Sequence, residues 1–90
     1  MKFIVKYNIP KGCVVDAEQR FLKTGGAPPE GVKMIGRWHG MNGGGVVIAE
    51  TNDAKALYSW LTYWNDLLEF ETTPCLEDAE AGEVVAAVKR

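Results

Sequence analysis

The sequence predicts a single α+β domain whose elements follow the order β-α-β-β-α-β, with one further helix at the C-terminal end. Three observations support this prediction. Four stretches alternate apolar and polar residues at the two-residue period of a strand. Other stretches repeat apolar residues at helical spacing. Segments rich in glycine and proline separate most of them, and 90 residues are enough for one domain, 1–90, with one small core.

The first half of the chain is predicted to form a strand, a helix and a second strand. Residues Lys2–Asn8 alternate in polarity, and Pro10 ends this strand because proline has no amide hydrogen for the ladder. A helix is expected over Val14–Lys23, where apolar side chains recur every three or four positions. Gly25 follows it and is typical of a helix end. Alternation returns over Val32–His39, which predicts the second strand.

The second half is predicted to form two more strands and two helices. The run Gly40–Gly45 is expected to be a hairpin turn and not a phosphate-binding loop, because a strand follows it and not a helix. That third strand covers Val46–Thr51. Asp53–Trp64 is expected to be a helix capped by its first residue. A fourth strand is expected over Leu67–Cys75, and a last helix over 77–88, whose small apolar residues predict close packing.

This order of elements is typical of the ferredoxin-like plait, an antiparallel four-stranded sheet with helices on one face. Simple alternation assigns these residues to the helix-covered face: Phe3, Val5, Tyr7, Val32, Met34, Trp38, Val46, Ile48, Leu68 and Phe70. The opposite face would carry charged side chains and the apolar residues Ile4, Ile35, Val47, Ala49 and Leu67. An open face with that many apolar residues needs a partner, and a second copy is the simplest one. We therefore expect a homodimer through the open sheet face.

Charged side chains of opposite sign are expected to meet on this open face. The first and last strands are neighbours in the plait, so residues at matching positions face one another. Lys2 and Lys6 are expected to pair there with Glu69 and Glu71.

The two cysteines are predicted to be free thiols. Cys13 follows the first strand and Cys75 ends the fourth, and the plait places these positions at opposite ends of the sheet, too far apart for a disulfide. Neither cysteine has another cysteine or a histidine at the spacing of a zinc or redox motif. We therefore expect no metal site and no cofactor.

The composition is that of a soluble globular protein. The chain is 47% hydrophobic and 24% charged, and its net charge of −2 disfavours a general nucleic-acid partner. No apolar run approaches the roughly 20 residues that a membrane helix needs. Met1–Lys6 lacks the apolar segment of a signal peptide. We therefore expect a cytoplasmic protein with no nucleic-acid or membrane partner.

A set of short motifs runs along nearly the whole chain: Lys2-Phe3, Pro28-Pro29-Glu30-Gly31-Val32, Gly36-Arg37-Trp38-His39, Glu50-Thr51, Asp53, Ala56-Leu57, Trp60, Trp64, Asp66-Leu67 and Pro74. This set resembles a family of short bacterial proteins, a domain of unknown function assigned to the dimeric α/β-barrel group. The resemblance implies the plait and the homodimer. More distant members of that group include muconolactone isomerases, cofactor-free monooxygenases and haem-degrading proteins, but their chemistry does not transfer, because one fold hosts many functions.

Two residues are candidates for catalysis. His39 is the only histidine, and histidine exchanges protons near neutral pH. Alternation places it with Arg37 on the open face, where a dimer would enclose both; the alternative is a strand-end histidine bonded to the hairpin backbone. Glu50 is assigned to the helix-covered face, where an isolated carboxylate would have a raised pKa and suit a general base. It equally fits a frayed strand end or a bulge that turns it outward.

Aromatic residues are the candidates for ligand binding. Six aromatic residues are expected to wall a pocket between the sheet and the helices: Trp38, Trp60 and Trp64 with Tyr7, Tyr58 and Tyr63. Trp60 and Trp64 lie one helical turn apart. The alternative is that they are simply core residues. Asn8 ends the first strand near the same rim and is expected to orient a ligand carbonyl, with Arg37 as a further polar contact.

Two functions fit these observations. The first is binding of a small, partly aromatic or acidic molecule between the sheet and the helices, with the tryptophans as walls and His39, Arg37 and Glu50 as polar contacts. A cofactor-free isomerase or monooxygenase, in which His39 or Glu50 handles the proton, is a variant of it. The alternative is a non-catalytic dimerisation or regulatory module.

Overall fold

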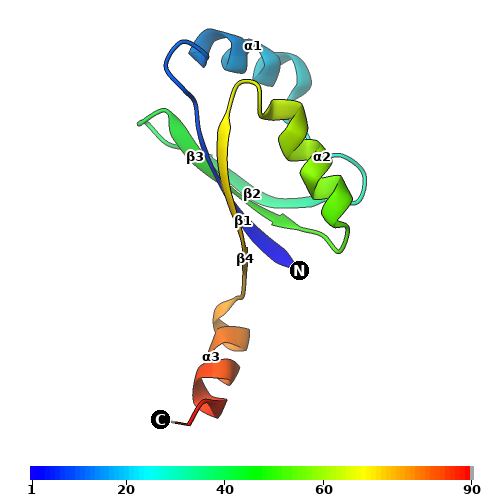
Figure 1. Ribbon diagram of the computed structural model, residues 1–90, viewed down its shortest axis with the longest axis vertical. Coiled ribbons are helices and arrows are strands. Elements are labelled where there is room, and N and C mark those ends of the chain that lie inside the picture. The colour runs from blue at the N-terminus through cyan, green and yellow to red at the C-terminus, as the bar shows by residue number, and fades with distance from the viewer. Residues whose placement is uncertain (90) are drawn as a thin grey trace.

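Within residues 1–89, which the structure describes, the elements follow the predicted order and confirm the α+β class (Figure 1). The structure is a computed structural model. Its elements are β1 (Lys2–Asn8), α1 (Val14–Thr24), β2 (Lys33–His39), β3 (Gly44–Glu50), α2 (Ala54–Trp64), β4 (Glu69–Cys75) and α3 (Asp78–Ala87). The bounds agree with the predicted ones to within two residues.

The four strands form one antiparallel sheet in the order β2-β3-β1-β4, with β3 and β1 at its centre. This is the strand order of a ferredoxin-like plait, which confirms the interpretation of the element order. Val5 on β1 lies opposite Val47 on β3 and Thr72 on β4, so these three side chains share one face. The same rule sorts the other residues of the sheet between a helix-covered face and an open face.

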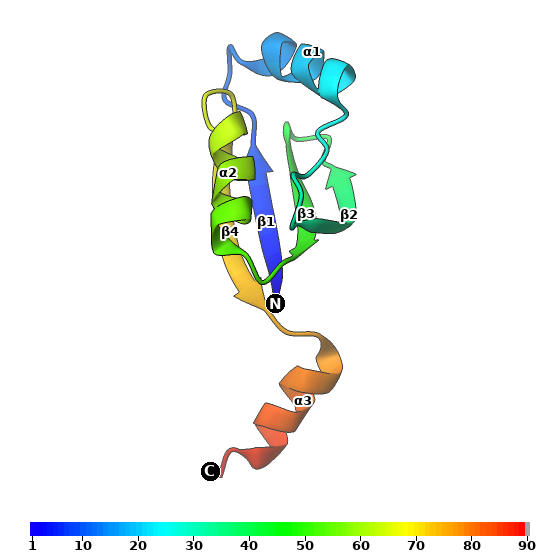
Figure 2. The ribbon, with the colours of Figure 1, turned by 90° about the vertical axis from the view of Figure 1, so that its right-hand side faces the viewer.

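α2 packs on one face of the sheet and forms the core with it (Figure 2). The buried core residues are Val5, Val32, Val47 and Ala49 with Leu57, Trp60 and Trp64 of α2. α1 lies differently, because it crosses the end of the sheet and buries only Ala17 (Figures 1 and 2). The space between α1, α2 and the sheet is therefore less tightly filled than the core beneath α2.

The start of α2 is fixed by two polar side chains. Asp53 caps the helix as predicted, because its Oδ1 accepts a hydrogen bond from the Ala56 amide at 3.1 Å. The buried Thr51 hydroxyl donates to the Gly31 carbonyl at 2.6 Å and accepts from the Asp53 amide at 2.9 Å. Thr51 therefore ties the loop before β2 to the first turn of α2.

The predicted faces of β3 are reversed in the structure. Val47 and Ala49 are buried beneath α2, whereas Val46 and Ile48, which were expected there, lie on the open face. Glu50 follows the same alternation and also lies on the open face. The reason is that both faces of this strand are apolar, so alternation alone cannot decide which set faces the helices. The register with β1 decides it.

The faces of β2 are reversed after its second residue. A bulge between Met34 and Gly36 adds one residue to the strand and changes the sense of the alternation. Met34 faces the helices as predicted, but Trp38 lies on the open face. Arg37 and His39, which were expected on the open face, lie on the helix-covered face. An isolated glycine inside a strand pattern is a known signal for such a bulge.

The ion pairs predicted between β1 and β4 on the open face are not formed within residues 1–89, although one of the two expected pairs of residues is in register. Lys6 lies directly opposite Glu71 in the register of β1 and β4. Lys2 instead contacts Glu50 at 3.2 Å and Glu77 at 3.1 Å. The hydrogen bond to Glu77 has the largest effect on the pKa of Lys2, and the hydrogen bond to Glu50 has the next largest; both raise it. The expected pairing of Lys2 with a β4 carboxylate is therefore wrong.

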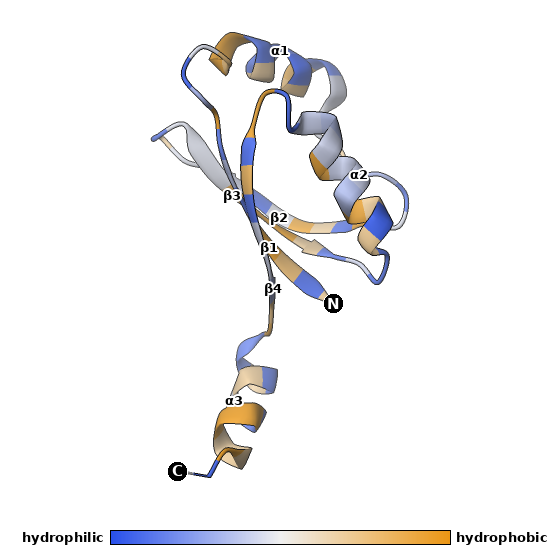
Figure 3. Cartoon of the chain, viewed as in Figure 1, coloured by the Kyte–Doolittle hydropathy of each residue, from blue (hydrophilic) through white to orange (hydrophobic). Residues whose placement is uncertain are grey.

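α3 does not pack against the rest of the chain. It projects from the end of β4, and none of its residues is buried (Figure 1). Figure 3 shows that part of this helix is apolar, and Val84 and Val85 are exposed. The close packing predicted for this segment is not made within the chain.

The predicted free thiols are confirmed. Cys13 directly precedes α1 and Cys75 ends β4, and neither forms a disulfide. Figure 1 shows α1 and the end of β4 at opposite ends of the sheet, which is the reason for this.

Candidate functional site

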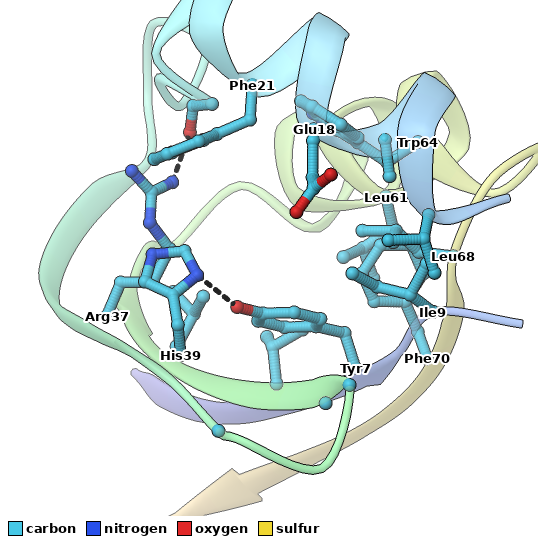
Figure 4. A pocket seen from close by; sticks show the side chains of 18 of the residues that line it. Tyr7, Ile9, Glu18, Phe21, Arg37, His39, Leu61, Trp64, Leu68 and Phe70 are labelled. Atoms are coloured by element: carbon cyan, nitrogen blue, oxygen red, sulfur yellow. Dashed lines mark hydrogen bonds between the residues drawn. The ribbon is translucent and has the colours of Figure 1, made fainter.

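A pocket of about 480 Å³ lies between α1, α2 and the helix-covered face of the sheet (Figure 4). Its walls are mainly apolar. Phe21 comes from α1, Leu61 and Trp64 from α2, and Val47 and Phe70 from the sheet. This volume is in the range of about 300–1,000 Å³ that is typical of small-molecule sites.

The polar centre of the pocket is a hydrogen bond between Tyr7 and His39. The Tyr7 hydroxyl on β1 lies 2.8 Å from Nδ1 of His39 on β2, although the two residues are 32 positions apart in the sequence. Both lie opposite Gly45 of β3, so the three residues form one row across the sheet. A Cβ atom at Gly45 would lie 2.3 Å from the Tyr7 hydroxyl oxygen. The missing side chain therefore lets the tyrosine reach across β3 to the histidine.

Arg37 connects this centre to α1. Its guanidinium donates to the carbonyl oxygens of Gly26 at 2.8 Å and Gly25 at 2.9 Å, at the C-terminal end of α1. It also lies 5.0 Å from the centre of the Phe21 ring, a cation–π distance. The Phe21 and His39 ring centres are 5.2 Å apart. Phe21 therefore joins the helix to Arg37 and His39 of β2.

The electrostatics of the pocket favour a protonated Tyr7 at neutral pH. Burial raises the pKa of the Tyr7 hydroxyl, and the nearby charge of Arg37 opposes this effect only in part. The hydroxyl can therefore donate a hydrogen bond. Glu18 of α1 supplies an acidic group, and its carboxylate points into the pocket from the side of α1 (Figure 4).

A second arginine holds α1 against the end of α2. Arg20 contacts both carboxylate oxygens of Asp66 at 2.8 Å, and it also donates to the Tyr63 carbonyl at 2.9 Å. Its guanidinium lies 5.3 Å from the ring centres of Tyr63 and Trp64. The hydrogen bond from Arg20 lowers the pKa of Asp66. This contact and that of Arg37 fix two ends of the wall that α1 provides.

Asp66→Asn is expected to make the protein less sensitive to acid. A carboxyl whose pKa is lowered by folding stabilises the protein above its unfolded pKa of about 4, and this stabilisation is lost as the pH falls through the folded pKa. Wild type should therefore be more stable than Asp66→Asn at pH 7, and this difference should shrink towards pH 3 in urea unfolding curves. Glu30→Gln is the matched control, because Glu30 forms no ion pair within residues 1–89. An equal difference at both pH values would contradict the role of the Arg20 contact.

The structure brings together some of the residues selected from the sequence and separates others. His39, Arg37, Trp60 and Trp64 line the pocket. Trp60 and Trp64 are only 8% and 7% exposed, so they are core residues as well as pocket walls. Tyr7 also lines the pocket as predicted, whereas Tyr58 and Tyr63 are exposed outside it. The open face carries Asn8, Trp38 and Glu50.

Glu50 has neither the position nor the pKa of a general base in the pocket, and it faces outward, as in the alternative interpretation. Its carboxylate lies on the open face, 3.2 Å from the ammonium group of Lys2. The hydrogen bond from Lys2 lowers the pKa of Glu50, which is the opposite of what the general-base interpretation requires. Glu50 therefore has no place in the pocket.

Phe21, Gly45 and Glu18 were not predicted from the sequence to be site residues. Tyr7 was expected only as an aromatic wall, and its hydrogen bond to His39, like the contacts of Phe21, depends on segments that are distant in the sequence. A signal was available for Gly45, because a glycine that continues into a strand marks a place where another group approaches closely. Glu18 carries no such signal in the sequence.

Comparison with known proteins identifies a family. The family model described as a domain of unknown function, DUF3303, matches residues 1–89. No curated protein and no solved structure matches the chain. Within residues 1–89, no cluster of three metal-binding side chains is formed, and no helix has the combined length and apolar character needed to cross a membrane.

Proposed function

The chain belongs to the DUF3303 family, whose function is unknown, and from its pocket we propose that it binds a small organic molecule between the sheet, α1 and α2. The ligand has a flat, mainly apolar body and an acidic or hydrogen-bonding oxygen. Its body lies against Phe21 and Trp64, and its oxygen lies near Tyr7, His39 and Arg37.

One observation carries this proposal. In a largely apolar pocket of about 480 Å³, the Tyr7–His39 hydrogen bond of 2.8 Å lies beside the charge of Arg37. A few convergent polar groups on an apolar wall are the usual composition of a ligand site. Isomerisation by proton transfer suits a tyrosine–histidine pair better than oxygenation does, because both side chains donate and accept protons.

Native mass spectrometry of the purified protein tests the proposal. We expect a reproducible additional mass of a small molecule, which is lost after denaturation. His39→Phe should lose the additional mass, because the imidazole is removed from the pocket while a ring is kept beside Phe21. Trp38→Phe is the matched control, because the neighbouring side chain points to the other face and should leave the ligand bound. Wild-type protein without additional mass, or equal binding by His39→Phe, would favour the second candidate below.

The second candidate is self-association through the open sheet face, as in a dimeric α/β barrel. Trp38 is 59% exposed and lies over Gly36, beside Val46, Ile48 and Ile4 in the adjoining rows of the sheet. An exposed tryptophan among aliphatic side chains is typical of a protein interface. Lys6 and Glu71 continue the same row as charged neighbours.

The shape of the chain also supports a partner. Its radius of gyration is 15.2 Å, whereas a compact chain of this length has about 12 Å. The excess arises from α3, which extends without covering its apolar residues (Figure 3). A single helix of ten residues is marginally stable in water by itself. A second copy that covers the open face and α3 would remove both exposed surfaces.

A further inference from the structure

The Tyr7–His39 hydrogen bond leaves both side chains able to exchange a proton with a ligand. In one arrangement the Tyr7 hydroxyl donates to Nδ1, and Nε2 carries the imidazole proton. In the other arrangement Nδ1 donates to the Tyr7 oxygen, the hydroxyl proton points elsewhere, and Nε2 is a free base. Nε2 has no hydrogen-bond partner within residues 1–89. The two arrangements are the two neutral tautomers of the imidazole: in the second, Nε2 is a base and the Tyr7 hydroxyl is a free acid on the same wall, and in the first these roles are reversed.

The surroundings of the pair select the chemical class of the ligand. The aromatic and aliphatic walls favour a flat ring. Arg37 places a fixed positive charge beside the pair, held by the carbonyls of Gly25 and Gly26. Glu18 enters from the opposite wall and disfavours an anionic group there (Figure 4). A ligand with a ring and a carboxylate is therefore oriented with its carboxylate towards Arg37, which brings the atoms between ring and carboxylate to the pair.

We propose that Tyr7 and His39 together catalyse the interconversion of the enol and keto forms of a small aromatic 2-keto acid, a proposal that rests on ligand binding in this pocket. In such a molecule the enol carbons and oxygen lie between the ring and the carboxylate. They are the atoms that the oriented ligand presents to the pair, and their interconversion requires one acid and one base.

The reaction is a proton relay in which no oxidant or reductant takes part. Nε2 of His39 accepts the enol hydroxyl proton, and the electron pair of that O–H bond forms the carbonyl π bond. The carbon–carbon π electrons take the hydroxyl proton of Tyr7 and form the new C–H bond. The Tyr7 oxygen regains a proton from Nδ1, so the imidazole ends with its proton on Nε2. The reverse steps convert the ketone to the enol, and proton exchange with water restores the starting tautomer.

Phenylpyruvate is a suitable probe, because its enol form is followed by its ultraviolet absorbance. Wild type should accelerate the loss of enol over buffer alone, and Tyr7→Phe should lower this rate about 10²-fold or more, the usual contribution of a positioned acid or base. Quenching of tryptophan fluorescence should show that Tyr7→Phe still binds the probe within a few-fold of wild type. Tyr58→Phe is the matched control, because Tyr58 is 73% exposed on α2 and should leave both values unchanged. Gly45→Ala should also lower the rate, because the new methyl group displaces the Tyr7 ring.

Three other outcomes would each contradict the proton relay, and they distinguish its failure from a failure of ligand binding. If wild type binds phenylpyruvate but does not accelerate its ketonisation, the relay is wrong while the pocket remains a binding site. If Tyr7→Phe matches the wild-type rate, Tyr7 is not the acid. If wild type does not bind phenylpyruvate, the aromatic 2-keto acid class is wrong, and ligand binding is then judged by the mass measurement alone.

Discussion

Trp60→Ala is expected to destabilise the protein by about 3–5 kcal/mol, which is the usual cost of removing a buried tryptophan. Trp60 is 8% exposed and packs between α2 and the centre of the sheet, where it also forms the floor of the pocket. Domains of this size have a total stability of about 5–15 kcal/mol, so this loss is a large fraction of it. The melting temperature should fall by at least about 12 °C, because each kcal/mol corresponds to about 4–8 °C here.

Thermal unfolding at a fixed protein concentration measures this effect. Tyr58→Ala is the control, because Tyr58 lies on the same helix and is 73% exposed. Its free energy of unfolding should change by no more than about 0.5 kcal/mol. A loss below about 1 kcal/mol for Trp60→Ala would mean that α2 does not pack on the sheet as described.

Trp38→Ala is expected to weaken the proposed homodimer about 30-fold or more without unfolding the protomer. Trp38 is 59% exposed, so little of the protomer's own packing is lost with it. An exposed tryptophan at the centre of an interface typically contributes at least about 2 kcal/mol to association, which corresponds to this factor. Neighbouring Arg37 and His39 face the pocket, so ligand binding within the protomer should be retained.

Sedimentation velocity over a series of protein concentrations measures the dimer dissociation constant. Tyr58→Ala again serves as the control, because it removes an exposed aromatic side chain from the helix layer on the other side of the sheet. A wild-type protein that stays monomeric throughout, or a Trp38→Ala dimer as tight as the wild-type dimer, would contradict self-association through the open face.

The order of elements could be predicted from the sequence because its signals are local. Alternation in β1, the Asp53 cap and the glycine turn before β3 each act within a few residues. The turn closes through a hydrogen bond from the Gly40 amide to the Gly44 carbonyl at 2.7 Å. Once the order was known, the strand order followed from the few topologies that right-handed crossovers allow.

The orientation of the strands could not be predicted equally well. β3 is apolar on both faces, so its alternation gives two equivalent solutions, and only pairing of Val47 with Val5 separates them. On β2 the bulge before Gly36 exchanges the positions of His39 and Trp38. Because of these two effects, His39 lies in the pocket, whereas Trp38 and Glu50 lie on the open face.

The polar centre of the pocket depends on contacts that no local pattern contains. Tyr7 and His39 meet across β3 only because Gly45 has no side chain. Arg37 reaches the end of α1 only because that helix crosses the end of the sheet. Alternation predicted that His39 and Arg37 share one face of their strand. Their partners could be identified only from the strand register and from the placement of α1.

Nitrogen-15 NMR of the His39 imidazole tests the account most directly, because His39 is the only histidine and its ring signals need no assignment among others. We expect the Nδ1 signal of wild type to differ from that of Tyr7→Phe, and phenylpyruvate to shift both ring nitrogens of wild type. Such a result would place the tyrosine–histidine pair at the ligand. Identical spectra of wild type and Tyr7→Phe, with no response to phenylpyruvate, would contradict both the hydrogen bond and its place in the pocket.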